Sequence, residues 1–367
     1  MRDGSAKIAD FATRLLHWFD RHGRHDLPWQ HPREPYRVWL SEIMLQQTQV
    51  STVIPFFRRF LARFPDVRSL AQAPLDDVLA HWAGLGYYAR ARNLHRCAQM
   101  IVERHGGEFP RDLEALTDLP GIGRSTAGAI LAQAFGQRHA ILDGNVRRVL
   151  ARHAAIAGWP GQPAVQNKLW TLSERLLPRE RLADYTQAIM DLGATVCSSR
   201  KPACGICPLR DDCAARLEGR VLDYPGAKPR RAHPQRRTWM LVIENAGGEI
   251  LCERRPPAGI WGGLWCLPMT EASQDWPAYC RTRFGLHCSP ASPLPAMRHG
   301  FTHFDLEILP LRLRMLAADD TIREGSDLAW IKMSASPAVG LPAPVRKLLE
   351  SPNLNLDRLQ CPGPSTA

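Results

Sequence analysis

The sequence predicts a two-part protein in which an all-α domain is followed by a smaller α/β domain. Helical apolar periodicity runs from about residue 7 to 216, and alternating strand patterns begin only at Thr238. The segment between them is basic and rich in Pro and Gly. With 367 residues, the chain is long enough for two or three domains with separate cores. We therefore expect a helical domain, a linker, an α/β domain and a flexible tail over residues 1–216, 217–237, 238–350 and 351–367.

A helical hairpin is predicted over about residues 116–135. Pro120 and Gly121 cannot continue a helix, and Gly123 permits the tight backbone from which the next helix starts. Apolar residues then recur at helical spacing, namely Ala127, Ile130, Leu131 and Ala134. The unpaired amides of residues 122–125 would bind an anion such as a nucleic-acid phosphate. A simple turn between two helices explains the same residues equally well.

Two acidic residues are candidates for chemistry. Glu42 flanks an apolar helical stripe that would desolvate its carboxyl and raise its pKa. A surface glutamate beside a core face is the alternative, and the segment alone favours it. Asp143 follows the hairpin, where it would act as the N-cap of a helix starting near Val146. From that residue alone, capping is the favoured interpretation.

The charge of the chain indicates a polyanionic partner. The formal net charge is +11 and the pI is about 9.4, with most of the positive charge on arginine. A generally basic surface without such a partner is the alternative. No apolar run reaches the roughly 18 residues of a membrane span, and residues 1–10 lack a signal-peptide core. We expect a cytoplasmic, nucleoid-associated monomer with no membrane partner.

Four of the ten cysteines are spaced C-x6-C-x2-C-x5-C within residues 197–213: Cys197, Cys204, Cys207 and Cys213. Structural disulfides are rare in a reducing compartment, so this spacing indicates a metal centre. Zinc is usually bound by two close cysteine pairs, whereas an iron–sulfur cube accepts one compact run of thiolates. The spacing favours [4Fe–4S] over zinc. Arg200, in the long loop between the first two cysteines, would then contact phosphate.

In this order and spacing, the hairpin, Asp143 and the cysteine loop resemble the helix-hairpin-helix base-excision DNA glycosylases. S-E-I-M-L-Q-Q-T-Q-V over 41–50, G-L-G-Y-Y over 84–88 and L-D-G-N-V over 142–146 are similar to the adenine DNA glycosylases of the MutY type. The resemblance runs from about Leu27 through the cysteine loop and resumes after the linker. It implies removal of adenine mispaired with 8-oxoguanine or guanine in double-stranded DNA, with the base flipped out of the duplex.

The resemblance also assigns residues to the reaction. It makes Glu42 the acid that protonates the leaving base, and Asp143 the carboxylate that stabilises the positively charged sugar. Asn145 matches an asparagine that holds the site together. In relatives that also cleave the strand, a lysine at the position of Ser125 attacks the sugar. Serine at this position implies that the product is an intact abasic site.

Further residues match the DNA contacts of the family. Gln47 and Tyr87 correspond to side chains that wedge into the duplex, although a helix-end glutamine and a core tyrosine are the plain alternatives. The hairpin backbone around Gly121, Gly123 and Ser125 corresponds to the phosphate site.

The C-terminal part resembles a Nudix-like fold, carried by W-G-G-L-W-C-L-P over residues 261–268. Nudix hydrolases need several glutamates on one helix to hold Mg²⁺, but the only acids between Arg255 and Phe304 are Glu271 and Asp275. The resemblance therefore implies a binding module. Its lesion-recognition loop is represented by Phe301, Thr302 and His303, with Thr302 where relatives often carry serine. A strand start with a buried histidine is the alternative.

The sequence thus predicts a monofunctional adenine DNA glycosylase containing a [4Fe–4S] cluster. Two alternatives remain: a bifunctional glycosylase and lyase acting on oxidised pyrimidines, and a non-catalytic lesion-binding protein.

Overall fold

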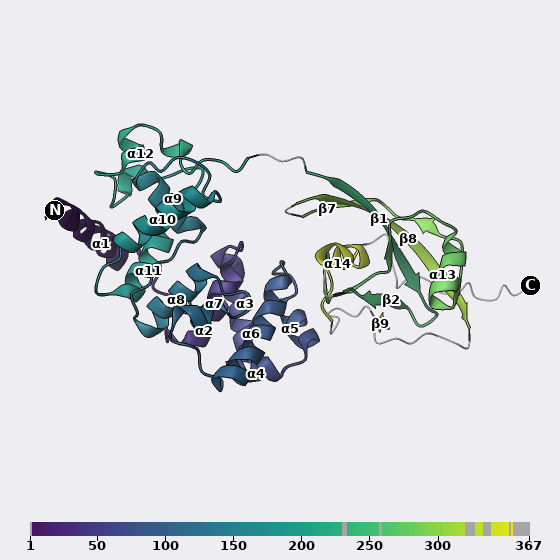
Figure 1. The fold of residues 1–367 in the computed structure, drawn as a ribbon. Coiled ribbons are helices and arrows are strands. Elements are labelled where there is room, and N and C mark those ends of the chain that lie inside the picture. The colour runs from purple at the N-terminus through teal and green to yellow at the C-terminus, as the bar shows by residue number, and fades with distance from the viewer. Residues whose placement is uncertain are drawn as a thin grey trace, which may run out of the picture. The chain divides into compact units, whose positions relative to one another are not determined.

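The computed structural model describes residues 2–229, 233–256, 259–301, 303–319, 327–332, 339–351 and 354. The chain divides into two compact units: residues 1–73 with 92–230, and residues 74–91 with 231–367. The first unit is helical and the second contains a β-sheet (Figure 1), so the predicted fold class is confirmed. Within the described residues, every helix is too short or too polar to cross a membrane.

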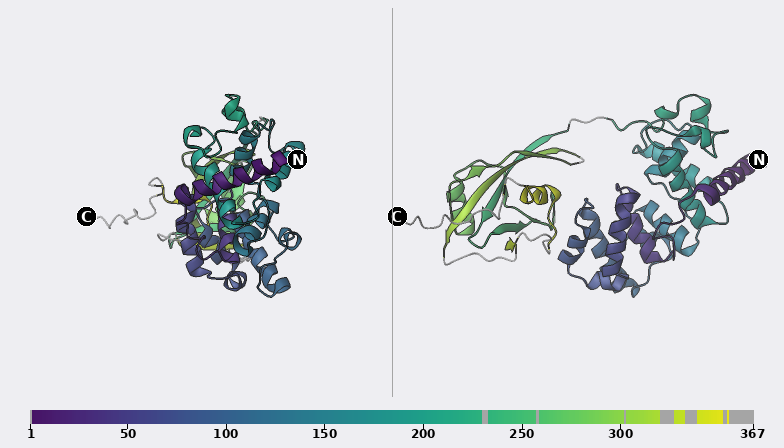
Figure 2. Two further views of the ribbon diagram at one scale, coloured as in Figure 1. Left: turned by 90° about the vertical axis from the view of Figure 1, so that its left-hand side faces the viewer. Right: turned by 180° about the vertical axis from the view of Figure 1, so that it is seen from behind.

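Helices account for the regular structure up to residue 223 (Figures 1 and 2). The α-helices are α1 (Arg2–His22), α2 (Pro35–Leu45), α3 (Val50–Arg63), α4 (Val67–Gln72), α5 (Leu75–Trp82), α6 (Ala89–His105), α7 (Leu113–Thr117), α8 (Arg124–Phe135), α9 (Gly144–His153), α10 (Pro163–Arg175), α11 (Leu182–Asp191) and α12 (Ala214–Leu217). Short turns of π- and 3₁₀-helix complete them: η1 (Leu192–Val196), η2 (Cys204–Ile206) and η3 (Val221–Asp223).

Helix α8 lies in the interior of the first unit. It ends at Gly136, whose φ of 64° is left-handed, as the sequence predicts. The sequence predicts an apolar stripe on one face only, but residues 126–133 are all buried. The reason is that α2, α7 and α11 all pack on this helix. At Gly128 the segment before α9 comes so close that an added Cβ would lie 2.4 Å from the carbonyl oxygen of Ala140. The absence of a side chain there lets the two backbones meet.

Gly128→Ala is therefore expected to lower the free energy of unfolding by about 1–3 kcal/mol, because the added methyl group meets backbone that cannot rotate away. Urea unfolding measures the change. Gly144→Ala is the matched control, since a Cβ at Gly144 meets nothing within 4 Å. Equal midpoints for the two variants would contradict the predicted close approach.

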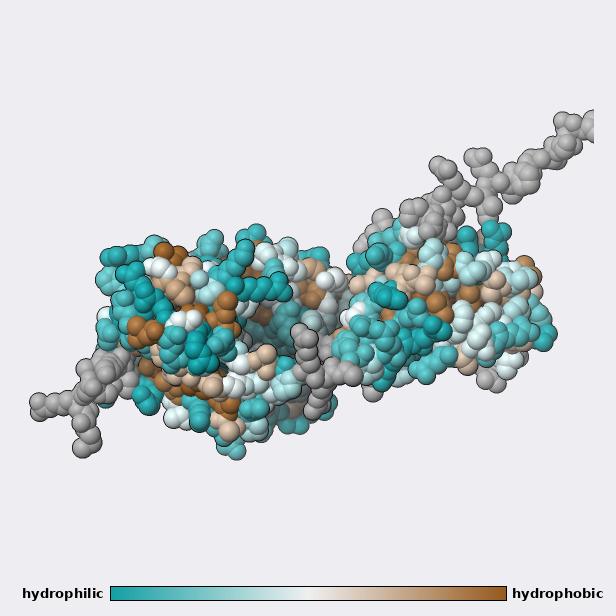
Figure 3. Space-filling model, turned by 90° about the horizontal axis from the view of Figure 1, so that it is seen from above, coloured by the Kyte–Doolittle hydropathy of each residue, from teal (hydrophilic) through white to brown (hydrophobic). Residues whose placement is uncertain are grey.

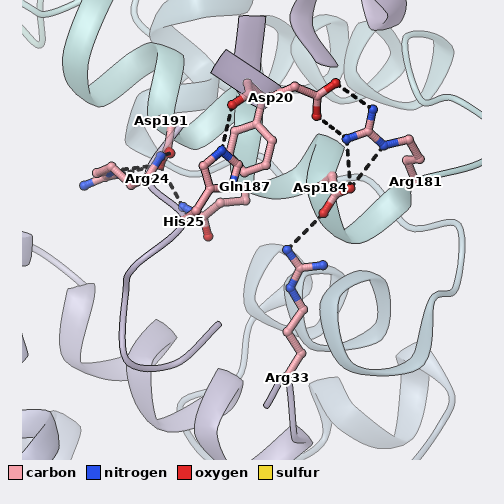
Figure 4. A network of polar contacts seen from close by, with 9 residues as sticks. Asp20, Arg24, His25, Arg33, Arg181, Asp184, Gln187 and Asp191 are labelled. Atoms are coloured by element: carbon pink, nitrogen blue, oxygen red, sulfur yellow. Dashed lines mark hydrogen bonds and ion pairs between the residues drawn. The ribbon is translucent and has the colours of Figure 1, made fainter. Parts of the chain in front are cut away.

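A polar network joins α1 and the loop after it to α11 (Figure 4). The buried carboxylate of Asp191 accepts hydrogen bonds from the backbone and guanidinium of Arg24, at 2.5–3.0 Å, and from Gln187 Nε2 at 2.7 Å. Arg181, which precedes α11, bonds Asp20 of α1 and Asp184 of α11. Asp191 is fully buried, and these donors offset the free-energy cost of desolvating its carboxylate.

The second unit contains a mixed sheet in which the order of the central strands is β3-β2-β1-β8-β5. The strands in the described residues are β1 (Gln235–Glu244), β2 (Glu249–Arg254), β3 (Trp265–Cys266), β4 (Met269–Thr270), β5 (Leu286–Cys288), β6 (Ser292–Pro293), β7 (Met297–Gly300), β8 (Asp305–Ala318) and β9 (Leu328–Lys332). Strands β1 and β2 pair antiparallel, and β1 pairs in parallel with β8. Leu241 and Ile243 pack with helix α13 (Trp276–Phe284), while Met240 and Val242, on the other face of β1, are buried as well. A further helix, α14 (Ala343–Leu349), completes the described elements.

Two local predictions need correction. The sequence of residues 301–313 predicts one strand, but β8 begins only at Asp305, and the Phe301 N–H donates instead to the Phe304 carbonyl oxygen at 2.8 Å. The segment predicted as an extended linker is ordered at both ends, by η3 and by β1. Gly226 N donates to Gly158 O at 3.0 Å, which connects the start of that segment to the helical unit.

On the face shown in Figure 3, apolar residues form small patches between hydrophilic ones.

Candidate active site

The hairpin presents free backbone amides at the start of α8. Gly121 has a φ of 80°, which favours glycine, whereas Gly123 has an ordinary φ of −92° and open space where a Cβ would be. One part of the prediction is wrong: the Ile122 amide donates to the Leu119 carbonyl at 3.2 Å and closes the turn. The amides of residues 123–125 have no hydrogen-bond acceptor within the described chain, because they belong to the first turn of the helix. These three amides remain free to donate to a group outside the chain.

Glu42 lies on α2 and is enclosed by protein on most sides while keeping some contact with solvent. Among the described residues, its carboxyl has one hydrogen bond, and that bond is long: Gln133 Nε2 of α8 donates to Oε1 at 3.4 Å. Burial and, after it, the negative charge of Asp143 together raise the pKa of Glu42 to about 8, although the hydrogen bond from Gln133 opposes the rise. The two carboxyls, a hundred residues apart in sequence, are therefore close neighbours in the fold, and Glu42 holds a proton at neutral pH.

Asp143 is both the N-cap of α9 and a member of this carboxyl pair. Its Oδ1 accepts the Val146 N–H at 2.7 Å, so the predicted capping role is confirmed, although the helix begins at Gly144. Its Oδ2 accepts a hydrogen bond from Asn145 Nδ2 at 3.3 Å. Burial raises the pKa of Asp143, whereas these hydrogen bonds and the charge of Arg148 oppose the rise. Asp143 has more donors than Glu42, so it is the member of the pair that ionises first.

The cysteine loop is bound to α9 by two arginines. Arg148 donates to the carbonyl oxygens of Cys197, at 2.8 Å, and Gly193, and also to Asn145 Oδ1 at 2.8 Å. The buried Arg152 donates to the carbonyls of residues 197, 198, 199 and 224, and its Nη1 lies 3.3 Å from Cys197 Sγ. These contacts fix the loop and place a positive charge beside one thiol.

Burial and, after it, the charges of the other three cysteines raise the pKa of the Cys207 thiol to about 11, so the four thiols are neighbours. In the described residues, no group of three His, Cys, Asp or Glu side chains is arranged to hold one metal ion. Four neighbouring thiols in one loop are the donor set that an iron–sulfur cluster takes. The positive charge of Arg152 suits a cluster carried by thiolates.

The predicted DNA-contact residues differ in their surroundings. Gln47 is exposed just after α2 with a φ of 59°, and Arg200 is exposed in the cysteine loop. Tyr87 is 48% exposed with a φ of 50°, so the core-tyrosine alternative is wrong. Ser125 offers its amide at the hairpin, and its hydroxyl accepts the Leu142 N–H at 2.9 Å.

In the second unit, Phe301 and His303 belong to an aromatic cluster at the turn between β7 and β8. Phe301 stacks on Phe304 with ring centroids 4.6 Å apart, and it meets His299 edge-on at 4.7 Å. His303 is exposed, so the buried-histidine alternative is wrong; Thr302 lies outside the described residues. Helix α13 carries no acidic residue.

Sequence reasoning missed three residues of the site: Gln133, Arg148 and Arg152. Gln133 is a buried amide within residues 127–135, which are otherwise apolar, and that exception is a usable signal in the sequence. The two arginines lie four residues apart on α9, so they share a face. Nothing in the sequence says that this face meets the cysteine loop.

Three known families match this chain. Residues 40–175 match the HhH-GPD superfamily of base excision DNA repair proteins, and residues 197–213 match the iron–sulfur binding domain of endonuclease III. Residues 238–351 match the NUDIX domain. The helical unit is thus of the HhH-GPD base-excision class with an iron–sulfur loop, and the sheet-containing part is Nudix-like.

Relatives that align with most of this chain identify the family within the base-excision class. The adenine DNA glycosylase of Buchnera aphidicola subsp. Acyrthosiphon pisum is 37% identical over 346 residues, which cover 94% of this chain and 98% of that protein. The human adenine DNA glycosylase is also 37% identical, covering 72% of this chain and 58% of that protein. A solved thermostable thymine-DNA glycosylase is 29% identical, with a TM-score of 0.51, and covers 58% of this chain and 98% of its own. The chain belongs to the adenine DNA glycosylase family of base excision repair.

Proposed function

We propose that this glycosylase hydrolyses the bond between adenine and deoxyribose where adenine lies opposite 8-oxoguanine or guanine in duplex DNA, and that it leaves the abasic site intact. The observation that carries the proposal is the carboxyl pair, in which Glu42 keeps a proton near pH 8 beside Asp143. Loss of a base needs an acid for the leaving group and an anion for the sugar cation, and this pair supplies both.

Glu42 acts as the general acid. The flipped adenine carries away the bonding electrons of the glycosidic bond, and a proton from Glu42 makes it a better leaving group. With a pKa of about 8, Glu42 is protonated before the reaction and still acidic enough to transfer its proton. Its contact with solvent allows it to be reprotonated afterwards.

Asp143 stabilises the positive charge that develops on the sugar. Its Oδ1 accepts the capping hydrogen bond, its Oδ2 accepts a hydrogen bond from Asn145 Nδ2 at 3.3 Å, and its negative charge acts on Glu42. Asn145 itself is held by Arg148, so the amide is fixed in the orientation that donates to Asp143. A fixed anion beside the reacting sugar lowers the barrier without reorganising during the step.

The reaction stops at the abasic site because Ser125 supplies no amine. Its hydroxyl is already engaged by the Leu142 N–H, and the lyase reaction needs an amine that forms a Schiff base with the sugar. Water therefore completes the hydrolysis, and the strand stays whole.

DNA binding rests on the hairpin amides and on exposed side chains. The amides of residues 123–125 take a backbone phosphate, which explains glycine at position 123: inside the protein nothing requires it, whereas a phosphate must approach closely. Gln47 and Tyr87 enter the duplex around the flipped base, and Arg200 contacts phosphate. All of these proposed DNA contacts belong to one protein chain.

Reading of 8-oxoguanine is assigned to the loop of Phe301, Thr302 and His303. Phe301 is braced by the aromatic cluster, and the exposed His303 offers a ring nitrogen for hydrogen bonding. Stacking and hydrogen bonding are the contacts with which a binding loop distinguishes a modified base.

The cofactor is assigned as a [4Fe–4S] cluster held by Cys197, Cys204, Cys207 and Cys213. When bound, it supplies four metal–thiolate bonds that order the loop. Arg152 bonds that loop on its own account, and Arg148 joins it to Asn145.

One assay tests the proposal. A duplex with adenine opposite 8-oxoguanine is incubated with the enzyme and divided, and one half is treated with hot alkali. We expect strand breaks at the adenine only after alkali, and faster cleavage than with adenine opposite guanine. Breaks without alkali would indicate a lyase, and binding without breaks would indicate a lesion sensor. Enzyme lacking residues beyond 237 should lose the preference for 8-oxoguanine; an unchanged preference would exclude the lesion-reading role of that part.

The pH dependence follows from the pKa of Glu42. Only protonated Glu42 is active, so the single-turnover rate should be level near neutrality and fall about tenfold per pH unit above pH 8. Below neutrality, the rate falls where Asp143 becomes protonated, which occurs above its ordinary pKa of 3.8. Rates measured under saturating enzyme from pH 5 to 10 would check this, and a rate that stays level to pH 10 would contradict the role of Glu42.

A further inference from the structure

The residues between α8 and α9 form neither helix nor strand. Residues 136–143 have no regular structure, so their peptide groups must find partners elsewhere in the unit. Asp143 is the last residue of this segment. The position of the Asp143 carboxylate therefore depends on how firmly the preceding peptide groups are held.

One peptide group in this segment is bound on both sides by serine hydroxyls. The carbonyl of Ile141 accepts a hydrogen bond from Ser173 Oγ at 2.8 Å, and the amide of Leu142 donates to Ser125 Oγ at 2.9 Å. These two polar atoms belong to the same peptide bond. The serines come from different helices, Ser125 from the first turn of α8 and Ser173 from α10, where it is buried.

The neighbouring groups leave the segment little freedom. The carbonyl of Leu142 accepts a hydrogen bond from Arg147 Nε at 3.0 Å, and the carbonyl of Ala140 rests against Gly128. Leu142 is fully buried, so its amide cannot turn to water if the Ser125 hydroxyl is removed. The next residue along the chain is Asp143.

We propose that Ser125 and Ser173 are positioning residues that act together as a clamp on the Ile141–Leu142 peptide and thereby fix the Asp143 carboxylate. The inference rests on the proposed role of Asp143. A displacement of about 1 Å in a reacting group costs up to about 100-fold in rate, so a clamp one residue away affects the reaction directly. Ser125 serves two purposes in this arrangement, because its amide faces outward at the hairpin and its hydroxyl faces inward.

The test uses Ser125→Ala and Ser173→Ala in the full-length enzyme. Each is expected to lower the single-turnover rate by about 10- to 100-fold while the dissociation constant for the mismatched duplex changes less than about twofold. Ser125→Ala keeps the outward amide, which is why binding is preserved. Ser125→Thr keeps a hydroxyl at this half-buried position and should restore most of the rate. Thr171→Ala is the control on α10, since its hydroxyl bonds only the Asn167 carbonyl in the same helix.

A double-mutant cycle with Asp143→Asn separates this inference from the proposed function. If the serines act through Asp143, Ser125→Ala should cause little further loss in the Asp143→Asn background. Equal losses in both backgrounds, or wild-type rates for both serine variants, would overturn the clamp. A fully active Asp143→Asn enzyme would instead overturn the proposed function. Melting temperatures of all variants identify any loss caused by unfolding, and failure of Ser125→Thr to recover the rate in a folded enzyme would also count against the clamp.

Discussion

Glu42→Gln is expected to lower base removal by about 10²- to 10⁴-fold while binding to the mismatched duplex is largely kept. Glutamine has the shape of a protonated glutamate, and its carbonyl oxygen can still accept the hydrogen bond from Gln133. It has no acidic proton, so the leaving adenine departs unassisted. Single-turnover rates and duplex binding measured on the same preparation separate the two effects. Loss of binding together with the rate would argue for a structural role instead.

The same substitution also changes the pH dependence of stability. Burial raises the pKa of Glu42 from 4.5 to about 8 in the folded protein, so the stability contributed by the protonated group is complete below pH 4.5 and is lost as pH rises to about 8 and beyond. Glutamine cannot ionise, so the variant should melt at a higher temperature than the wild type at pH 9. The exposed Glu103 on α6 provides the control, since Glu103→Gln should change neither rate nor melting temperature.

Asp143→Asn is expected to lower the rate by about 10²- to 10³-fold, because it removes the anion that stabilises the sugar cation. Asparagine is also a good N-cap, so its Oδ1 can keep the hydrogen bond from the Val146 amide and α9 should remain intact. The charge of Asp143 is one cause of the high pKa of Glu42, so the alkaline fall in rate should move to lower pH in the variant. Rate against pH in both enzymes measures both effects.

A second aspartate cap separates charge from capping in this experiment. Asp66 caps α4 through the Ser69 amide at 2.8 Å, and Asp66→Asn is expected to leave rate and pH profile unchanged. A residual rate within a few-fold of wild type for Asp143→Asn, or an alkaline limb that does not move, would show that the two carboxyls do not work as a pair.

Much of the fold follows from local sequence patterns. Gly136 ends α8 in the left-handed conformation and Asp275 caps α13, and both features depend on only a few neighbouring residues. The start of β8 at Asp305 is not predicted, because a sequence rich in aromatic residues is typical of a strand even where Phe301 stacks on Phe304. The partners of Gln133, Arg148 and Arg152 could not be predicted either, since each bond spans dozens of residues.

The sequence by itself determined which chemical groups this protein has: two acids, a serine where lyases carry lysine, four spaced cysteines and glycines at a helical hairpin. Only the tertiary structure decided what those groups do to one another. The proton on Glu42 depends on burial and on the charge of Asp143, which is about a hundred residues away in sequence. The position of Asp143 in turn depends on the hydroxyls of Ser125 and Ser173, from two other helices. Desolvation and hydrogen bonding act over a few ångströms, so they are set by which segments the fold brings together and not by distance along the chain.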